Sequence, residues 1–382
     1  MKRTMIIILS LSGGGAERVV SVLASELAEK DYPISVAVYD RKENEYPISP
    51  KLIIHELEKP HGKNKIMRLI NRIRELRQLI ITEKSDVVIP FLAMPTVHTW
   101  MAVQGMKCEF YSTIRNNPKV YPPQFLLRTI SNYITRKSDK IIIQTKEQEK
   151  YIQSCRNKCV IMPNPVKQEM IDAEYTPAEE VSTIATFGRL NKQKNHGLLI
   201  RAFKLISEEY PNVRLYIWGT GEEYDALWKL IKELGLVGRA LVCGSTTNVV
   251  DELKKTDIFV LSSDYEGLPN ALMEAMAVGV PCVSTNCPTG PRDLIDNKKN
   301  GLLVEIGNEL RLAEALKELI NKKSLREVSI CLRNIDNFTR GGALADYEAV
   351  YADGERLQAI WRGKKTAHIT TPAGTDLYME MN

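Results

Sequence analysis

Two glutamates and the helix between them carry the clearest chemical signal in this sequence. In EGLPNALMEAMAV, Glu266 precedes and Glu274 follows Pro269, whose fixed φ suits a first helical turn, so a helix should begin near Asn270. The free N–H groups around Leu268 to Asn270 and the positive end of the helix dipole would favour phosphate. Burying an unpaired carboxylate is costly, so Glu274 must either pair with a buried cation or face a polar pocket.

Cations and glycines follow three predicted strands. STIATFG ends at Gly188 and leads into Arg189 and Lys194, RLYIWG ends at Gly219 and leads into Thr220 and Gly221, and DIFVLSS leads into the loop that holds Glu266 and Gly267. Open α/β sheets bind ligands at the carboxyl ends of their strands, and glycine lets a ligand approach the backbone. The loops therefore predict an anion-binding edge, although charge alone also fits a solvated basic loop.

The elements that position these loops alternate between apolar β-rich runs and amphipathic helical stretches. This alternation is typical of parallel sheets covered by helices, and it stops and restarts once along the chain. We therefore predict an α/β fold of two Rossmann-like domains that face a central cleft. The expected boundaries are 1–165, a linker at 166–180, 181–337, and a tail at 338–382.

The amino-terminal glycine cluster has two interpretations. Gly13, Gly14 and Gly15 lie between a predicted strand and helix, where they could bring the backbone close to a diphosphate or an acceptor once the cleft closes. The alternative is a dinucleotide site completed by Asp40, as in an NAD-dependent oxidoreductase. The third glycine of that fingerprint would fall at Arg18, which argues against this alternative.

Composition sets the broad class. The chain has 382 residues, 44% of them hydrophobic, and a net charge of +5 that does not by itself indicate nucleic acid binding. The sequence has no apolar run long enough to span a bilayer, and the apolar stretch at its start is too short for a signal peptide, so we expect a cytoplasmic protein. The seven scattered cysteines suggest reduced thiols, and no acidic cluster suggests a metal site.

Several motifs together resemble one enzyme family. EGLPNALME with FGRLNKQKN before it and NCPTGPRDLI after it, together with SLSGGGAERVV and IRNNP at 114–118, is similar to the signature of retaining family 4 glycosyltransferases of the GT-B fold. The nearest branch builds bacterial surface polysaccharides and glycan precursors. The resemblance runs from about residue 4 to about residue 335, and the motifs occur in the order typical of the family.

The resemblance implies a role for each candidate residue and no cofactor. Glu274 would bind the ribose of a nucleoside diphosphate sugar, often a uridine diphosphate sugar, and Glu266 would contact the transferred sugar. Arg189 and Lys194 would neutralise the diphosphate without a metal ion, with Lys192 the weaker match. The backbone at Leu268, Pro269 and Asn270 would hold the distal phosphate, and the loop after Gly244 would flank the base. The family also implies that the configuration of the sugar is retained.

The sequence departs from the family after the strand EFYSTI. Many relatives have a histidine there, whereas this chain has Arg115 and Asn116, either of which could contact the sugar. His98 is a candidate substitute, and a packed or surface histidine is the alternative.

The segment 61–80 is a candidate binding surface for the acceptor. It combines an apolar stripe of Ile66, Leu69, Ile70, Ile73 and Leu76 with the cations Lys63, Lys65, Arg68, Arg72, Arg74 and Arg77. Such a helix suits an anionic membrane surface or a lipid diphosphate, and therefore a lipid-linked glycan acceptor. A surface helix docked by its stripe is the alternative.

The tail does not match the family. KKTAHITTPAGTDLYMEM alternates like two strands around a Pro-Ala-Gly turn, where relatives finish with a helix that crosses back to the first domain. This difference keeps open a second hypothesis, a non-catalytic subunit of a polysaccharide assembly complex that retains the sugar-nucleotide fold.

Overall fold

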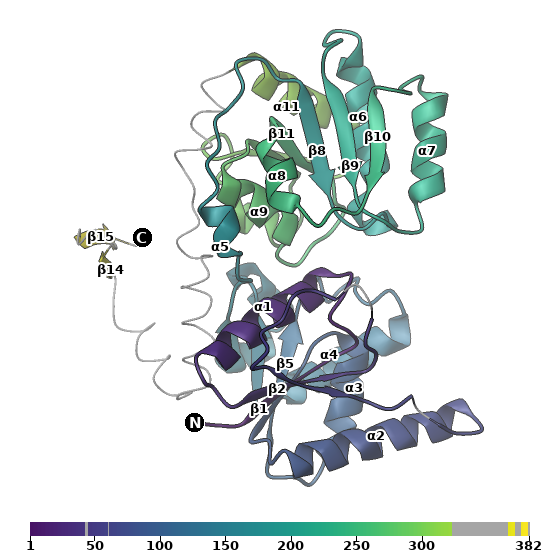
Figure 1. Ribbon diagram of the computed structural model, residues 1–382, viewed down its shortest axis with the longest axis vertical. Helices are drawn as coiled ribbons and strands as arrows, with labels where there is room; N and C mark the ends of the chain where they lie inside the picture. Colours follow the sequence, from purple (N-terminus) through teal and green to yellow (C-terminus); the bar gives the residue numbers. More distant parts are fainter. Residues whose placement is uncertain (43–44, 60, 323–365, 371–375, 381–382) are drawn as a thin grey trace.

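The computed structural model describes residues 1–42, 45–59, 61–322, 366–370 and 376–380. Two parallel sheets, one above the other in Figure 1, have the strand orders β3-β2-β1-β4-β5-β6-β7 and β10-β9-β8-β11-β12-β13. Each order reverses direction after a central strand, as in a Rossmann fold. The predicted architecture of two Rossmann-like domains is confirmed.

The first sheet forms because its inner strands are short runs rich in β-branched residues that are buried on both faces, whereas the edge strands β3 and β7 are partly exposed. In β1, Ile6 and Ile8 pack in one core and Met5 and Ile7 in the opposite one. The strands are β1 (Thr4–Ile8), β2 (Ile34–Val38), β3 (Ile53–Glu56), β4 (Val87–Pro90), β5 (Glu109–Ile114), β6 (Lys140–Ile143) and β7 (Cys159–Ile161).

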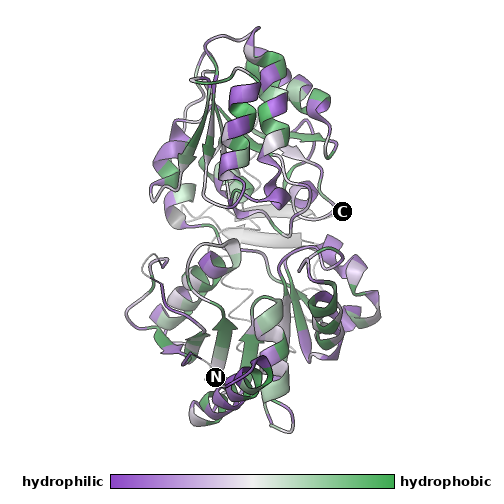
Figure 2. Ribbon diagram, turned by 90° about the vertical axis from the view of Figure 1, so that its right-hand side faces the viewer, coloured by the Kyte–Doolittle hydropathy of each residue, from purple (hydrophilic) through white to green (hydrophobic). Residues whose placement is uncertain are grey.

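Helices cover both faces of this sheet, as the paired cores require. They are α1 (Gly15–Glu29), α2 (Lys65–Thr82), α3 (Ala93–Ala102) and α4 (Phe125–Lys137), with 3₁₀ turns at Lys146–Tyr151 and Gln153–Lys158. Helix α1 buries Val19, Val20, Leu23 and Leu27, a spacing that places one face against the sheet. Figure 2 shows hydrophobic residues concentrated on the strands and polar residues on the outer helix faces.

The second domain repeats the pattern. Its strands are β8 (Thr183–Phe187), β9 (Arg214–Trp218), β10 (Ala240–Gly244), β11 (Ile258–Leu261), β12 (Cys282–Thr285) and β13 (Leu302–Val304). Its helices are α6 (His196–Ser207), α7 (Tyr224–Glu233), α8 (Val249–Lys254), α9 (Asn270–Val278), α10 (Pro291–Leu294) and α11 (Glu309–Asn321), with a 3₁₀ turn at Lys192–Lys194. Helix α9 begins at Asn270 as predicted and ends at Gly279, whose φ of 100° closes the helix.

The predicted linker is more structured than its composition suggested. Helix α5 (Gln168–Ile171) lies within it, and Val166, Met170 and Ala173 are buried in the core that includes α9. These three residues are spaced by four and three, as on one helix face, and they attach the segment to the second domain; the run is too short to stand out from the surrounding prolines and charges.

The tail contains the two strands that its alternation predicted. Strands β14 (Thr366–Thr370) and β15 (Asp376–Glu380) pair antiparallel, with Thr366 opposite Glu380. The rest of the predicted 338–382 segment, where relatives place a closing helix, lies outside the described residues.

Helix α2 differs from the prediction in the direction of two of its cations. Arg72 is buried; it donates to Glu75 at 2.7 Å, and its guanidinium lies 4.7 Å from the ring centre of Tyr39. Arg77 donates to the backbone oxygens of Ala102 and Gln104. Both guanidiniums therefore bind groups within the first domain and do not add to the exposed positive charge of α2. None of the helices within the described ranges combines the length and apolar composition needed to cross a membrane.

Candidate functional site

A cleft of about 540 Å³ lies between the carboxyl ends of the two sheets. Nearly all the predicted site residues line it: Gly13, Gly14, Gly15, Arg115, Asn116, Gly188, Arg189, Lys194, Gly219, Glu266, Leu268, Pro269, Asn270 and Glu274. Gly244 does not line the cleft. Its carbonyl accepts a 2.7 Å hydrogen bond from the N–H of Gly219, so it supports a loop that does line it. Ser245 and Thr246 reach the cleft instead.

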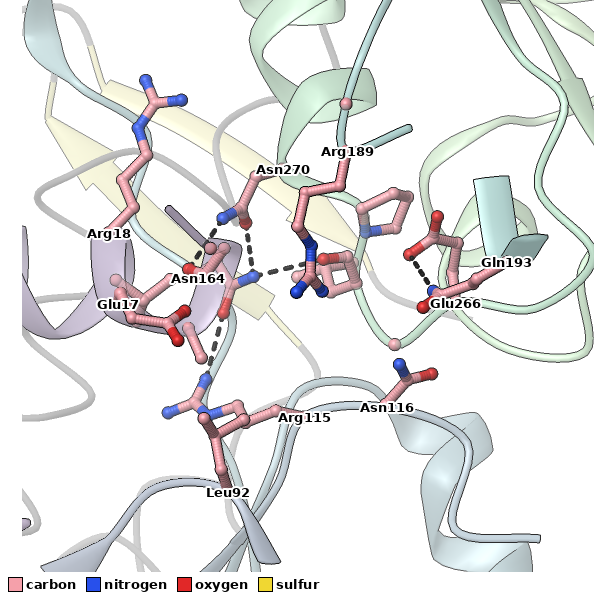
Figure 3. A pocket seen from close by; sticks show the side chains of 18 of the residues that line it. Glu17, Arg18, Leu92, Arg115, Asn116, Asn164, Arg189, Gln193, Glu266 and Asn270 are labelled. Atoms are coloured by element: carbon pink, nitrogen blue, oxygen red, sulfur yellow. Dashed lines mark hydrogen bonds between the residues drawn. The ribbon is translucent and has the colours of Figure 1, made fainter. Parts of the chain in front are cut away.

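The basic loop after β8 is held by a backbone hydrogen bond to the loop after β9. The N–H of Leu190 donates to the carbonyl of Thr220 at 2.8 Å, which leaves Arg189 exposed and directed into the cleft (Figure 3). Gly188 makes room for Lys194, because an added Cβ would lie 3.3 Å from the Lys194 Cε. Lys192 is exposed and absent from the lining, in keeping with its weaker match.

Glu266 is buried in a network that belongs to the second domain. Its Oε1 lies 2.6 Å from the Lys194 Nζ and accepts from the Ser263 hydroxyl at 2.6 Å. Gln193 approaches Oε2 at 3.4 Å, and the Thr289 hydroxyl donates to the Glu266 carbonyl at 2.5 Å. Because β8 and β11 flank the point where the strand order reverses, their two loops bring Lys194 and Glu266 together.

The amino end of α9 is partly occupied by the first domain. The N–H of Leu268 donates to the Gln144 Oε1 at 3.1 Å. The Asn270 side chain donates to the Gly15 carbonyl at 3.1 Å and accepts from the Asn164 amide at 2.5 Å (Figure 3). A phosphate at this helix end would therefore have to replace Gln144 at the Leu268 N–H, a partner that the sequence did not reveal.

Glu274 takes the first of the two alternatives left open by the sequence. Its Oε1 lies 2.5 Å from the Nη1 of Arg18, a residue of α1 in the other domain. The carboxylate also lines the cleft, so the ion pair and a ligand would meet at the same group. Burial raises the pKa of Glu274, while the neighbouring Arg18 opposes that rise.

Three glycines allow the two domains and their loops to touch through backbone. A Cβ on Gly267 would lie 2.3 Å from the Arg115 carbonyl oxygen, across the domain junction. One on Gly290 would lie 2.1 Å from the Gly267 oxygen, and one on Gly219 only 1.8 Å from the Gly188 oxygen. Real Cβ atoms do not approach oxygen that closely, so these positions require glycine.

The amino-terminal wall contributes a glycine turn and a second carboxylate. Gly13 has a φ of 82°, which suits the turn from β1 into α1. Glu17, in the first turn of α1, lines the cleft, and burial raises the pKa of its carboxyl above the ordinary value. Figure 3 shows Glu17 and Arg18 leaving α1 in different directions.

Arg115 and His98 both contact other side chains of the first domain. Arg115 donates to the Asn164 Oδ1 at 3.0 Å and stacks over Phe91 at 4.5 Å, although it also lines the cleft. His98 is absent from the lining; its Nδ1 lies 2.9 Å from the Tyr39 hydroxyl. Burial lowers the pKa of His98 to about 4. The packed-histidine alternative therefore describes His98, whereas Asn116 lines the cleft, with its Oδ1 accepting from the N–H of Asn117 at 2.7 Å (Figure 3).

The arrangement suits an anion flanked by hydroxyl-bearing groups. Arg189 and Lys194 supply positive charge at one strand edge, and Glu266 and Glu274 supply acceptors on either side of the α9 terminus. Within the described ranges, no group of three or more His, Cys, Asp or Glu side chains is arranged to hold a metal ion. The protein groups that face the cleft are thus well suited to a diphosphate carrying two sugars.

Two family models divide the chain between them. The model for glycosyl transferases group 1 matches residues 167–330, and the model for Glycosyltransferase Family 4 matches residues 13–169. The two matches meet within the segment that joins the sheets.

Similar proteins extend the comparison. The N-acetylgalactosamine-N,N'-diacetylbacillosaminyl-diphospho-undecaprenol 4-alpha-N-acetylgalactosaminyltransferase of Campylobacter jejuni is 30% identical over 86% of this chain and 92% of its own length. An uncharacterized glycosyltransferase of Methanocaldococcus jannaschii, MJ1059, is 32% identical over 60% of each chain. A crystal structure of mutant TarM from S. aureus, solved with Fondaparinux, alpha-GlcNAc-glycerol and UDP, superposes with a TM-score of 0.77 at 16% identity, over 92% of this chain and 100% of that chain.

Proposed function

The chain belongs to the glycosyltransferases, and from this premise we propose that it moves a hexosyl or N-acetylhexosaminyl group from a nucleoside diphosphate sugar to a glycan acceptor. The observation that carries the proposal is the juxtaposition of Arg189, the Lys194–Glu266 pair and the α9 terminus at one edge of the cleft. The pathway we propose is bacterial polysaccharide or lipopolysaccharide synthesis, the setting of several similar proteins.

The residues of the second domain suit the departure of a diphosphate. When the bond between the sugar C1 and the phosphate oxygen breaks, negative charge grows on the leaving group. Arg189 and Lys194 are placed to stabilise that charge, and each charged hydrogen bond contributes roughly 1.5–3 kcal/mol. In this proposal the cations act without a metal ion.

Glu266 is placed for the transferred sugar. Its carboxylate accepts hydrogen bonds from Lys194 and from Ser263, which keep it oriented. The acceptor hydroxyl forms its bond to C1 from the face that the diphosphate leaves, and its proton passes to the departing phosphate oxygen. This course retains the configuration at C1 and needs no protein nucleophile.

We take uridine diphosphate as the donor nucleotide. Thr220, Ser245 and Thr246 line the end of the cleft beyond Gly219, where their hydroxyls could bind a base. The TarM crystals contained UDP in a protein of the same fold. Glu274, at the other side of the α9 terminus, is the proposed partner of the ribose hydroxyls.

The proposed acceptor is a lipid-linked glycan at the inner face of the cell membrane. Ile66 and Met67 of α2 are 70% and 50% exposed, and Phe125 and Leu126 of α4 are 73% and 70% exposed. Arg68 lies on the same exposed stretch of α2. Exposed apolar residues flanked by cations suit an interface between lipid and water, and the C. jejuni relative is named for a diphospho-undecaprenol acceptor.

The experiment is a transfer assay with the full chain. A panel of UDP sugars is first tested by thermal shift, since a ligand at about a hundred times its Kd stabilises by roughly 2.7 kcal/mol. Sugars that stabilise the protein are then assayed for hydrolysis and for transfer to undecaprenyl-diphosphate glycans, with product configuration read by NMR. We expect activity that survives a chelator. An inverted product or magnesium-restored activity would contradict the retaining or the metal-free step, and absence of turnover with all nucleoside diphosphate sugars would contradict the proposal itself.

A further inference from the structure

Glu274 makes an ion pair that the proposed ribose contact does not explain, because its partner, Arg18, belongs to the opposite domain. Its side chain is 8% exposed, and the Arg18 Nη1 lies 2.5 Å from its Oε1, with the Arg18 side chain 17% exposed. A buried carboxylate and a largely covered guanidinium attract strongly at this distance, and removing Arg18 leaves the charge of Glu274 buried without compensation.

The approach of Arg18 to Glu274 is fixed by neighbouring contacts. Gly15, in the same turn of α1, receives a 3.1 Å hydrogen bond from Asn270, which lies one turn before Glu274 in α9. An added Cβ at Gly15 would lie only 3.2 Å from that amide nitrogen. Asn164 accepts two donors from the first domain and donates to Asn270 at 2.5 Å, so the register of α1 against α9 is held from both sides.

The ion pair leaves room for a ligand on the same carboxylate. The contact joins a single guanidinium nitrogen to Oε1, and both residues line the cleft. A carboxylate has about four lone-pair sites, so one that holds an arginine can still accept from the two hydroxyls of a vicinal diol.

We propose that Arg18 is a positioning residue for the donor: it keeps Glu274 ionised and oriented so that the carboxylate can accept both ribose hydroxyls. This inference rests on the proposed function. It makes the donor site of the second domain incomplete without the first, so that donor affinity depends on closure of the cleft.

The charges around Glu274 favour this interpretation. The other groups that act on it electrostatically are Lys167, which favours its ionised form, and Glu169, which opposes it, both from the segment around α5. Tyr46 from the first domain is a neutral group at neutral pH, since burial raises its pKa. Arg18 is the cation in direct contact, and burial alone raises the pKa of Glu274.

The test compares Arg18→Met with the charge-conserving Arg18→Lys and with Arg201→Met, which removes an exposed ion pair to Glu309. The affinity for UDP is measured by calorimetry between pH 5.5 and 8.5. We expect Arg18→Met to weaken UDP binding by about tenfold or more at pH 7 and to move the acidic loss of affinity to higher pH. Arg18→Lys should recover part of the UDP affinity and part of the shift in its pH dependence. Arg201→Met should bind UDP like the wild type.

A ligand-free measurement separates pairing from simple structural loss. The deficit in unfolding free energy of Arg18→Met should grow as pH rises, because the variant must then either retain a proton or bury an unpaired charge. It should shrink at low pH, where Glu274 is protonated with or without Arg18. In a Glu274→Gln background the pH dependence of this deficit should vanish.

Each result decides a different claim. Unchanged or tighter UDP binding in Arg18→Met would overturn the positioning role and leave the transferase proposal standing. A deficit in stability that is the same at every pH would assign Arg18 a structural role only. Failure of the wild type to bind UDP would overturn the proposed donor and this inference with it.

Discussion

The two walls of the cleft are built from the same fold but hold their polar groups differently. On the second domain, Lys194, Ser263 and Glu266 satisfy one another within a single network. On the first domain, Arg18 and Gln144 find their partners across the junction, at Glu274 and Leu268. The Lys194–Glu266 network is therefore assembled within one domain, whereas the Arg18–Glu274 and Gln144–Leu268 contacts form only when the two domains meet.

The outer surfaces differ in the same sense. The first domain exposes two neighbouring apolar residues at the start of α2, Ile66 and Met67, and two more at the start of α4, Phe125 and Leu126. On the second domain the most exposed large hydrophobics are single residues, Leu310 in α11 and Val237 in the turn between α7 and β10. This contrast supports the proposal that the second domain holds a small charged donor and the first meets a larger, partly apolar acceptor.

The largest expected loss of activity comes from the Lys194–Glu266 network within the second domain. Lys194→Met removes a cation from the diphosphate and leaves Glu266 buried without its partner. We expect kcat/KM to fall by about 10²–10³-fold, measured by UDP-sugar turnover. Lys192→Met is the matched control, because Lys192 is exposed and outside the cleft. Equal losses in both variants would show that the charge of the loop, and not its geometry, matters.

The next effect tests the contact between the walls. Gly267→Ala places a Cβ 2.3 Å from the backbone oxygen of Arg115, so the domains must separate. Displacement of about 1 Å lowers transfer rates by about a hundredfold, and we expect a loss of that order in kcat. The control is Gly235→Ala, where the φ of 67° adds strain of about 1–2 kcal/mol but the Cβ meets open space. Full activity in Gly267→Ala would contradict the claim that close backbone contact between the two domains is needed for transfer.

A smaller effect is expected on the outer surface. Ile66→Ser with Phe125→Ser removes two exposed apolar side chains, so KM for a lipid-linked acceptor in anionic vesicles should rise by roughly five- to tenfold. KM for a water-soluble short-chain acceptor should not change. Val237→Ser with Leu310→Ser, at similar exposure on the second domain, serves as the control. A rise with both acceptors would indicate a general defect of the enzyme.

The smallest effect is a pH dependence shared by the two domains. Burial lowers the pKa values of His98 and His196, one in each domain, to about 4. Below about pH 6.5 the unfolded chain binds protons that the folded chain refuses, so stability falls as pH drops towards 4. We expect His98→Phe to recover roughly 1–2 kcal/mol of that loss in denaturant unfolding at pH 4.5.

Activity provides the second readout for His98. Because this histidine lies outside the cleft, His98→Phe should leave turnover at pH 7 close to that of the wild type. A large loss of turnover with unchanged stability would return His98 to the list of candidate sugar contacts.

Local signals in the sequence predicted the elements and loops that lie within one domain. Pro269 marked the start of α9, and the runs EFYSTI and ALVCG marked β5 and β10 at their observed bounds. These features depend on neighbouring residues, so a single chain is enough to read them.

The partners of the site residues could not be predicted in the same way. Arg18 and Glu274, like Asn164 and Leu268, are more than a hundred residues apart, and their contact depends on how the domains dock. The direction of Arg72 was predicted wrongly. Helical periodicity shows which face of a helix a residue occupies, but not that Glu75 and the ring of Tyr39 would accept its guanidinium. The arginine in GGGAERVV was a usable signal for Arg18, as it lies in the first turn of the helix that starts at the glycine cluster.

The three glycines at 219, 267 and 290 restrict how this enzyme could acquire a new specificity. Backbone lies against backbone there, so no side chain is available to vary and any enlargement disturbs two loops at once. Ser131, Asn132 and Thr135 line the same cleft from α4, where substitution changes shape without moving the main chain. Diversification, whether natural or by directed evolution, should therefore concentrate on that helix and leave the glycines invariant.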